Sequence, residues 1–423
     1  MSSIRFPVLG ACAVLAVVGV LPGLVPAVDS IRVIHHFGED DGEYPDTDVM
    51  ADAAGNLYGT TVQGGDFNSG TVFKLTKTPA GWSESVLYSF TSGADGGQAY
   101  GGVTLDAEGN IYGTTVVGGQ FGACPEDGCG VVWKLTNDGG SYSHSVIHPF
   151  QGGTEDGYGP GGPLSFDAQG RLYGMTPGGG EFGMGTIFQL TPTPAGPWDE
   201  VIIHDFSGGE DGGGASKARL LIEDNGDIYG VATVGGTFGV GTVFKLSPQA
   251  GGGWAYATLY AFQGIPDGVF PYGGVIRDAA GDLYGTTYYG GTQDVGVVYR
   301  LTEKDGVWTE TVLHSFLDGA DGSYPISALV FGDDGALYGT TSSGGAGHGT
   351  IFQLALGPGG QWRERVVHAF DGSDGELPYA GLLKAANGSF YGTAVHGGED
   401  GDGTIFHFSP PASGLSAPNF QKH

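Results

Sequence analysis

The sequence is short of basic residues. Of its 423 residues only 16 are Lys or Arg, whereas 46 are Asp or Glu, which gives a formal net charge of −30. Proteins bind nucleic acids and anionic membrane surfaces mainly through Lys and Arg, so this balance argues against both partners. The acidity suits a protein that stays soluble outside the cell, and divalent cations are the sharper alternative explanation of it.

Catalytic motifs and helical patterns are missing as well. The chain has no nucleophile elbow, Walker loop, His-Glu-x-x-His sequence or dinucleotide-binding fingerprint. Carboxylate pairs can be chosen in many ways among 46 acidic residues, so they do not identify a glycosidase. Beyond the first 30 residues no segment has the periodicity of an amphipathic helix, which favours an all-β fold. A non-enzymatic role is favoured, and enzymatic activity stays open.

Charge is nearly absent from the N-terminal segment. An uncharged apolar run lies between Phe6 and Val28, and we predict that residues 1–27 are a signal peptide cleaved after Ala27. An uncleaved membrane anchor is one alternative, and a lipoprotein box that ends at Cys12 is another.

Cysteine occurs only three times, and two of these residues flank one loop. Cys124 and Cys129 are too few for a structural zinc site. An oxidising compartment outside the cell favours a disulfide between them. Such a bond would pin a loop rather than hold the fold together.

Glycine is abundant, with 85 residues, and it recurs in register. A Tyr-Gly pair occurs seven times, at intervals of 53 to 61 residues, and a Gly-Gly pair begins six residues after each tyrosine. The tyrosines are Tyr58, Tyr112, Tyr173, Tyr229, Tyr284, Tyr338 and Tyr391. Each repeat contains four short segments rich in β-branched and aromatic residues. The pattern predicts an all-β, seven-bladed β-propeller of four-stranded blades over residues 31–409, with residues 410–423 as a C-terminal tail.

The two ends of the repeat region complement each other. The segment Ile31–Phe37 matches a fourth strand, and the last repeat stops after a third strand, Thr404–Phe408. We therefore expect Val33–Phe37 to pair with Gly403–Phe408 and to close the ring, which removes the open sheet edges. Small residues fill the strand before each Tyr-Gly pair, so we place that strand innermost and the strand that ends in Phe outermost.

The repeated phrase also resembles a known family. Leu-Tyr-Gly-Thr-Thr, then Gly-Gly, then Gly-Thr-Val-Phe-Lys-Leu at Leu57–Leu75 is similar to the GloVer repeat of bacterial choice-of-anchor tandem-repeat proteins. The resemblance extends from Ile31 to Ser409. It implies an exported bacterial protein, secreted or at the cell surface, and carries over no activity or catalytic residue. Residues 410–423 do not match the anchoring segment of many members, which favours free secretion.

Two polar positions recur in every repeat. An Asp-Gly pair follows each outer strand, with aspartates Asp41, Asp95, Asp156, Asp211, Asp267, Asp321 and Asp374. Asp and Gly are typical of turns, and a calcium site is the alternative, although no loop has EF-hand spacing. No other cofactor is expected. Two residues before each outer-strand Phe stands His35, Tyr88, His148, His204, Tyr260, His314 or His368. Spread around the rim, these side chains cannot share one metal, and we interpret them as structural.

Positions that differ between repeats are better candidates for a ligand site than positions that all repeats share. The loop after Gly-Gly carries a phenylalanine in the first four repeats only: Phe67, Phe121, Phe182 and Phe238. These rings either cover their own blades or form an exposed aromatic arc. Beside the inner strands stand two cations and three tyrosines: Lys217, Arg219, Tyr100, Tyr272 and Tyr379. They would suit an anionic or sugar ligand, unless the cations pair with local acids such as Glu223.

Three functions are compatible with these patterns. We favour a propeller for binding or surface interaction, with a polysaccharide or an extracellular protein as partner, and we expect a monomer. In that case the aromatic arc should be exposed. The alternatives are an enzyme that acts on an extracellular polysaccharide, which requires converging acids or a His–acid pair in the channel mouth, and a structural component of an envelope or matrix.

Overall fold

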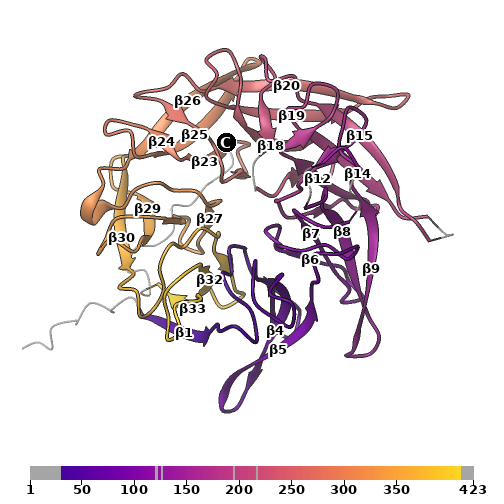
Figure 1. The fold of residues 1–423 in the computed structure, drawn as a ribbon. Helices are drawn as coiled ribbons and strands as arrows, with labels where there is room; N and C mark the ends of the chain where they lie inside the picture. Colours follow the sequence, from indigo (N-terminus) through magenta and orange to yellow (C-terminus); the bar gives the residue numbers. More distant parts are fainter. Residues whose placement is uncertain (1–29, 120–121, 125–126, 194–195, 216–217, 411–423) are drawn as a thin grey trace, which may run out of the picture.

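The chain folds into a ring of antiparallel sheets (Figure 1). The computed structural model describes residues 30–119, 122–124, 127–193, 196–215 and 218–410. The described residues contain no α-helix, only the short 3-10 turn η1 (Gly319–Asp321), and no helix among them could cross a membrane. The predicted signal peptide, the tail after Pro410, Phe121 and Lys217 lie outside the described residues.

Each of the first four blades has four strands, which follow one another from the axis outward. Blade 1 contains β2 (Met50–Ala51), β3 (Leu57–Thr60), β4 (Thr71–Thr78) and β5 (Gly81–Ser89). Blade 2 contains β6 (Val103–Leu105), β7 (Ile111–Thr115), β8 (Val131–Asn137) and β9 (Tyr142–Pro149). Blade 3 contains β11 (Ser165–Phe166), β12 (Leu172–Thr176), β14 (Thr186–Thr191) and β15 (Asp199–Asp205). Blade 4 contains β17 (Leu221–Ile222), β18 (Ile228–Val234), β19 (Thr242–Pro248) and β20 (Trp254–Ala261), and β16 (Gly213–Ala215) also pairs with β18.

The other three blades follow the same order. Blade 5 contains β22 (Val275–Arg277), β23 (Leu283–Thr287), β25 (Val297–Lys304) and β26 (Val307–Ser315). Blade 6 contains β27 (Val330–Phe331), β28 (Leu337–Thr341), β29 (Thr350–Leu356) and β30 (Trp362–Ala369). Blade 7 contains β31 (Leu383–Lys384), β32 (Phe390–Ala394), β33 (Thr404–Ser409) and β1 (Ser30–His36). Two short ribbons pair loops, β10 (Gly157–Tyr158) with β13 (Gly178–Gly179) and β21 (Gly268–Val269) with β24 (Tyr289–Gly290). The predicted seven-bladed propeller, with its inner and outer strands, is confirmed.

Ring closure is also confirmed. In β1 and β33, Val33 pairs with Phe406 and His36 with Thr404, and the Phe37 amide donates to the Gly403 carbonyl at 3.0 Å. The first and last parts of the described chain therefore lie side by side in one blade (Figure 1). A hydrogen bond of 2.9 Å from Thr393 Oγ1 to the carbonyl of Thr47 adds a link from blade 7 to blade 1.

The Tyr-Gly pairs serve the packing of each blade. The Tyr58 hydroxyl donates to Asp52 at 3.0 Å, and Tyr112, Tyr173, Tyr284 and Tyr338 make the equivalent bond. A Cβ atom on Gly59 would lie 2.5 Å from Cζ of Phe73 in the next strand, so an aromatic ring occupies the space that a side chain would need. This contact explains why glycine follows the tyrosine.

The Gly-Gly pairs join two sets of loops on one face of the ring. Gly64 has φ +79°, and a Cβ atom there would lie 2.6 Å from Cα of Gly42, in the loop that enters blade 1. In antiparallel blades, the loops between second and third strands emerge on the same side as the loops between blades. We call this side the loop face, and it carries all the candidate sites.

Candidate functional site

The inner strands begin around a cavity on the propeller axis at the loop face. It has a volume of about 390 Å³. Every blade contributes residues from the short segment that precedes its inner strand, and this shared origin explains why the cavity lies on the axis. The polar and aromatic lining includes Asp46, Asp48, Tyr100, Arg219, Tyr272 and Tyr379, joined by Tyr288 from the end of β23. Four of the residues singled out from the sequence, Arg219 and the three tyrosines, thus line one cavity.

Four tyrosines line this cavity: Tyr100, Tyr272, Tyr288 and Tyr379. Tyr272 meets Tyr288 edge to face with ring centroids 5.7 Å apart, and Tyr288 stacks on Tyr324 at 5.1 Å. Burial, with its tyrosine neighbours, raises the pKa of Tyr288. The Tyr288 hydroxyl therefore stays protonated at neutral pH. The wall combines flat apolar rings with hydrogen-bonding groups.

Arg219 belongs to both the fold and the cavity wall. Its guanidinium donates to Thr104 Oγ1 at 2.7 Å, to the carbonyl of Val103 at 3.1 Å and to the carbonyl of Leu164. Burial lowers the pKa of Arg219, and the charge of Asp48 opposes that shift. The suggested partner Glu223 was wrong for Arg219, because Glu223 forms an ion pair with Arg277 instead. Arg219 ties blade 4 to blades 2 and 3.

The phenylalanines after the Gly-Gly pairs point into solvent. Phe67 is 59 % exposed, and Phe182 and Phe238 are each 54 % exposed. They do not fold back over their own blades, so the first four blades carry an open aromatic arc at the described positions. Whether the arc binds a ligand stays a prediction.

The Asp-Gly aspartates form turns, as the structural interpretation predicts. Asp95 accepts the Thr91 amide at 3.0 Å, and the other six aspartates bond the corresponding segment in the same way. Each aspartate also lies beside the His or Tyr of the preceding outer strand. Tyr88 donates to Asp95 at 2.9 Å, for example, and His368 Nε2 lies 2.7 Å from Asp374. Calcium binding by these loops stays a prediction.

A third side chain reaches each of these pairs from the next blade. It stands on the outer strand, four residues before that blade's own His or Tyr, and completes an inter-blade groove at the rim. In chain order from the blade 7/1 groove, the third residues are Glu84, His144, Glu200, Tyr256, Glu310 and Glu364, and the equivalent position in the last groove is Ile31. Stacking shows two of these contacts, with ring centroids 4.3 Å apart for His144 on Tyr88 and 4.0 Å for Tyr256 on His204.

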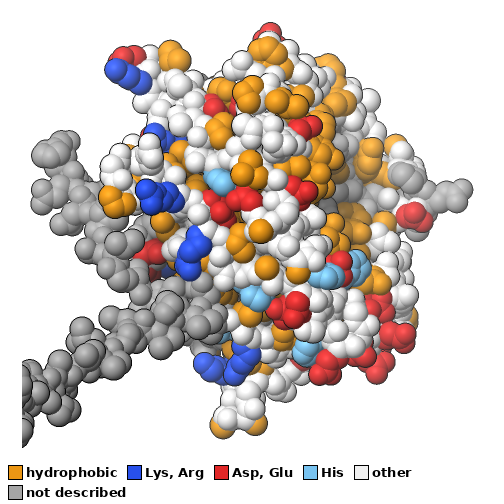
Figure 2. Space-filling model, turned by 90° about the vertical axis from the view of Figure 1, so that its left-hand side faces the viewer, with side chains coloured by type: hydrophobic (Ala, Val, Ile, Leu, Met, Phe, Trp, Pro, Cys, Tyr) orange, Lys and Arg blue, Asp and Glu red, His pale blue; other side chains and the backbone are white. Residues whose placement is uncertain are grey.

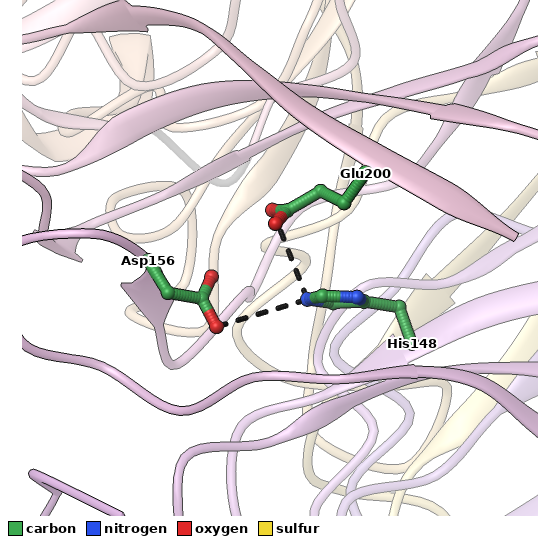
Figure 3. A group of neighbouring side chains, drawn as sticks. All are labelled: His148, Asp156 and Glu200. Atoms are coloured by element: carbon green, nitrogen blue, oxygen red, sulfur yellow. Dashed lines mark ion pairs between the residues drawn. The ribbon is translucent and has the colours of Figure 1, made fainter.

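The groove between blades 2 and 3 brings three potential metal ligands together (Figure 3). Nε2 of His148 in β9 lies 3.8 Å from an oxygen of Asp156 and 3.7 Å from an oxygen of Glu200 in β15. The three side chains are 13 %, 11 % and 15 % exposed. Burial raises the pKa of Glu200 to about 7, with Asp156 adding to the shift and His148 opposing it.

The predicted disulfide braces the loop of this groove. Cys124 and Cys129 are bonded, and a Cβ atom on Gly152 would lie 2.6 Å from Sγ of Cys124. The Ala123 amide donates to the Gln151 carbonyl at 2.9 Å. The disulfide loop therefore packs directly against the segment that carries Asp156.

Sequence reasoning missed the grooves. It separated the histidines from one another correctly, but it did not pair each outer-strand His or Tyr with its aspartate and with a side chain of the next blade. The available signal was a glutamate four residues before Tyr88, His204, His314 and His368. Closely spaced side chains of different repeats cannot be identified from one sequence without the propeller geometry.

Comparisons with known proteins agree with this architecture. The model of the Gloeobacter/Verrucomicrobia repeat family matches residues 17–125, 124–346 and 220–418. No curated protein matches the chain. Among solved structures, a putative 6-phosphogluconolactonase from Bacteroides uniformis has a TM-score of 0.52 at 14 % identity and covers 80 % of this chain and 88 % of its own.

Two further structures resemble the chain at similar levels. A protein from Lactobacillus plantarum has a TM-score of 0.53 at 12 % identity, covering 84 % of this chain and 99 % of its own. An ancestral GH74 enzyme has a TM-score of 0.53 at 9 % identity, covering 92 % of this chain and 52 % of its own. At these identities the likeness concerns the fold alone.

Proposed function

We propose that this chain, which belongs to the Gloeobacter/Verrucomicrobia repeat family, is an exported propeller that binds a neutral carbohydrate in its axial cavity. The observation that carries the proposal is the wall of that cavity, where half-buried tyrosines from three blades stand beside carboxylates and one guanidinium. Flat aromatic faces with a few directional polar groups are what a sugar ring requires, because it has an apolar face and a rim of hydroxyls.

The charges around the cavity support a neutral ligand over an anionic one. Asp46 and Asp48 line the wall, and the guanidinium of Arg219 is already bonded to two carbonyls and a hydroxyl. An anion would meet these carboxylates, and among the described residues that line the cavity no cation other than Arg219 could neutralise it. The exposed arc of Phe67, Phe182 and Phe238 would give a longer polymer a second contact on the same face.

The test is calorimetric titration of the full chain with neutral hexasaccharides that differ in linkage and sugar. We expect at least one to bind, and we expect the double variant Tyr100→Ala, Tyr272→Ala to weaken that binding at least tenfold. Tyr158→Ala is the matched control, because Tyr158 is an exposed tyrosine that belongs neither to the cavity nor to the aromatic arc. A panel in which nothing binds, or binding that the tyrosine variant leaves intact, would overturn the proposal.

The same samples test the enzymatic alternative. Chromatography of the incubated hexasaccharides would reveal shorter products if the cavity catalysed cleavage. The His–Asp pairs of the outer strands lie at the rim of the propeller. Asp46 and Asp48 line the cavity, but no histidine is among the described residues that line it with them. We therefore expect the sugars to be recovered intact.

A further inference from the structure

We propose that the groove between blades 2 and 3 binds one divalent transition-metal ion, held by His148 Nε2 and by the carboxylates of Asp156 and Glu200. This inference is independent of the axial cavity. It starts from the three ligand atoms, which all lie within 4.8 Å of one another (Figure 3).

The spacing of these atoms fits a shared ion better than direct hydrogen bonds. At 3.8 and 3.7 Å, the separations of His148 Nε2 from the two oxygens exceed hydrogen-bond length. Two ligands of a tetrahedral ion with metal–ligand bonds of about 2.1 Å lie about 3.4 Å apart, so a small inward movement would satisfy all three. His148 Nε2 and Glu200 Oε1 are both buried without a hydrogen-bond partner among the described residues.

The other histidine grooves are narrower, although Nε2 of His35 and His204 is likewise buried without a hydrogen-bond partner and His314, Asp321 and Glu364 form a second three-ligand group. Nε2 of His35, His204, His314 and His368 lies between 2.7 and 3.2 Å from its aspartate, which is hydrogen-bond distance. The sequence explains the difference, because eight residues separate His148 from Asp156 while six or seven separate the equivalent pairs elsewhere. The longer loop sets Asp156 back from the imidazole and opens the space that an ion would fill.

Asp156 is held in place for this role. One of its oxygens accepts the Gln151 amide and the other accepts the Gly157 amide, both at 2.6 Å. The loop closed by the disulfide packs against the same segment. Fixed ligands lower the ordering cost of binding an ion, and such supporting contacts are common around metal ligands.

The donor set selects the class of metal. One imidazole and two carboxylates suit Zn²⁺, Mn²⁺ or Co²⁺, whereas Ca²⁺ and Mg²⁺ prefer oxygen ligands alone. A cleft of about 390 Å³, lined also by Thr154 and Glu155, adjoins the three side chains and leaves room for further ligands such as water. We take Zn²⁺ as the probe, with Co²⁺ as its spectroscopic substitute.

The test uses the tag-free full chain, treated with EDTA and returned to metal-free buffer. Equilibrium dialysis with Zn²⁺, read by elemental analysis, should give one ion per chain, and Co²⁺ should give ligand-field bands in the visible spectrum. Both His148→Ala and the isosteric Glu200→Gln should weaken Zn²⁺ binding at least tenfold. His204→Ala is the matched control, because its groove has Tyr256 in place of the glutamate, and its binding should equal that of the unchanged chain.

Three results would overturn the proposal. The first is that no ion binds, and the second is that His148→Ala keeps the affinity of the unchanged chain. The third is that His314→Ala loses the ion while His148→Ala keeps it, which would place the ion in the groove between blades 5 and 6. Circular dichroism and melting temperatures identify any variant that has not folded. If His148→Ala fails to fold, Glu200→Gln alone decides, because it replaces a carboxylate oxygen with an amide of the same shape.

Discussion

At the scale of single residues, Arg219 links three blades through one guanidinium. Among the described residues it is the one Lys or Arg side chain on the inner-strand side of the loop face, and its donors go to carbonyls of blades 2 and 3 and to Thr104. Its position was recognisable from the sequence as a departure from the repeat. Its hydrogen bonds were not, because they run to residues more than 50 positions away.

We expect Arg219→Met to destabilise the fold by about 2 to 4 kcal/mol, because two buried carbonyls and a hydroxyl would lose a charged donor. Chemical denaturation of the variant and the unchanged chain measures the difference. Arg363→Met, on the exposed part of β30, is the control and should change the unfolding free energy by less than about 0.5 kcal/mol. Equal stability of the two variants would show that Arg219 does not brace the inner strands.

Glu310 should make the stability of the fold depend on pH. Its groove contains Tyr260 rather than histidine. Burial, with the charge of Asp267, raises the pKa of Glu310 to about 7 in the folded chain. The folded state then binds more protons than the unfolded state between about pH 4.5 and pH 7, so stability falls as pH rises through that window.

The variant Glu310→Gln removes this titration while keeping the shape of the protonated side chain. We expect its melting temperature, relative to the unchanged chain, to be higher at pH 8 than at pH 5. Glu303→Gln, at an exposed position of β25, should show the same difference at both pH values. If the melting temperatures of Glu310→Gln and the unchanged chain differ by the same amount at pH 5 and at pH 8, the raised pKa of Glu310 is contradicted.

At the scale of elements, the disulfide loop supports a neighbouring loop rather than the sheets. We expect the double variant Cys124→Ser, Cys129→Ser to lose about 2 kcal/mol at most, the entropic value for so short a closed loop. Hydrogen exchange should accelerate in residues 151–157, which the disulfide loop contacts, and stay unchanged in β7 and β8. Faster exchange throughout blade 2 would mean that the bond holds the sheet together.

The elements also show what a single sequence can and cannot predict. The strands, their order in the blade and the pairing of β1 with β33 followed from residues that repeat in register, because each repeat must bury the same faces. The axial residues were recognised as departures from that register. The grooves were not, because His148 and Glu200 belong to different repeats, and only the angle between blades decides which side chains meet.

At the scale of the whole molecule, charge is divided between the two faces. Among the described cations, Lys77, Arg171 and Lys304 stand on strand ends and turns toward the face opposite the loop face, whereas Arg219 lines the axial cavity. Figure 2 shows one side of the ring, where Lys and Arg lie to the left, while the histidines and many carboxylates lie in the middle and to the right. At the cavity, Arg219 stands with the carboxylates of Asp46 and Asp48, and this local charge affects which ligands can approach it.

The division of charge predicts how salt affects binding at the cavity. The affinity for a neutral hexasaccharide should change less than about twofold between 0.1 M and 1 M NaCl, since neither screening nor ion release involves an uncharged ligand. An oligogalacturonate of the same length should bind more weakly at 0.1 M and gain affinity at 1 M, as the Debye length falls from about 10 Å to about 3 Å and repulsion is screened. Calorimetric titration at both concentrations measures the two responses. If the oligogalacturonate binds more tightly at 0.1 M than at 1 M NaCl, Arg219, and not the surrounding carboxylates, sets the potential in the cavity. The proposed preference for neutral sugars would then be wrong.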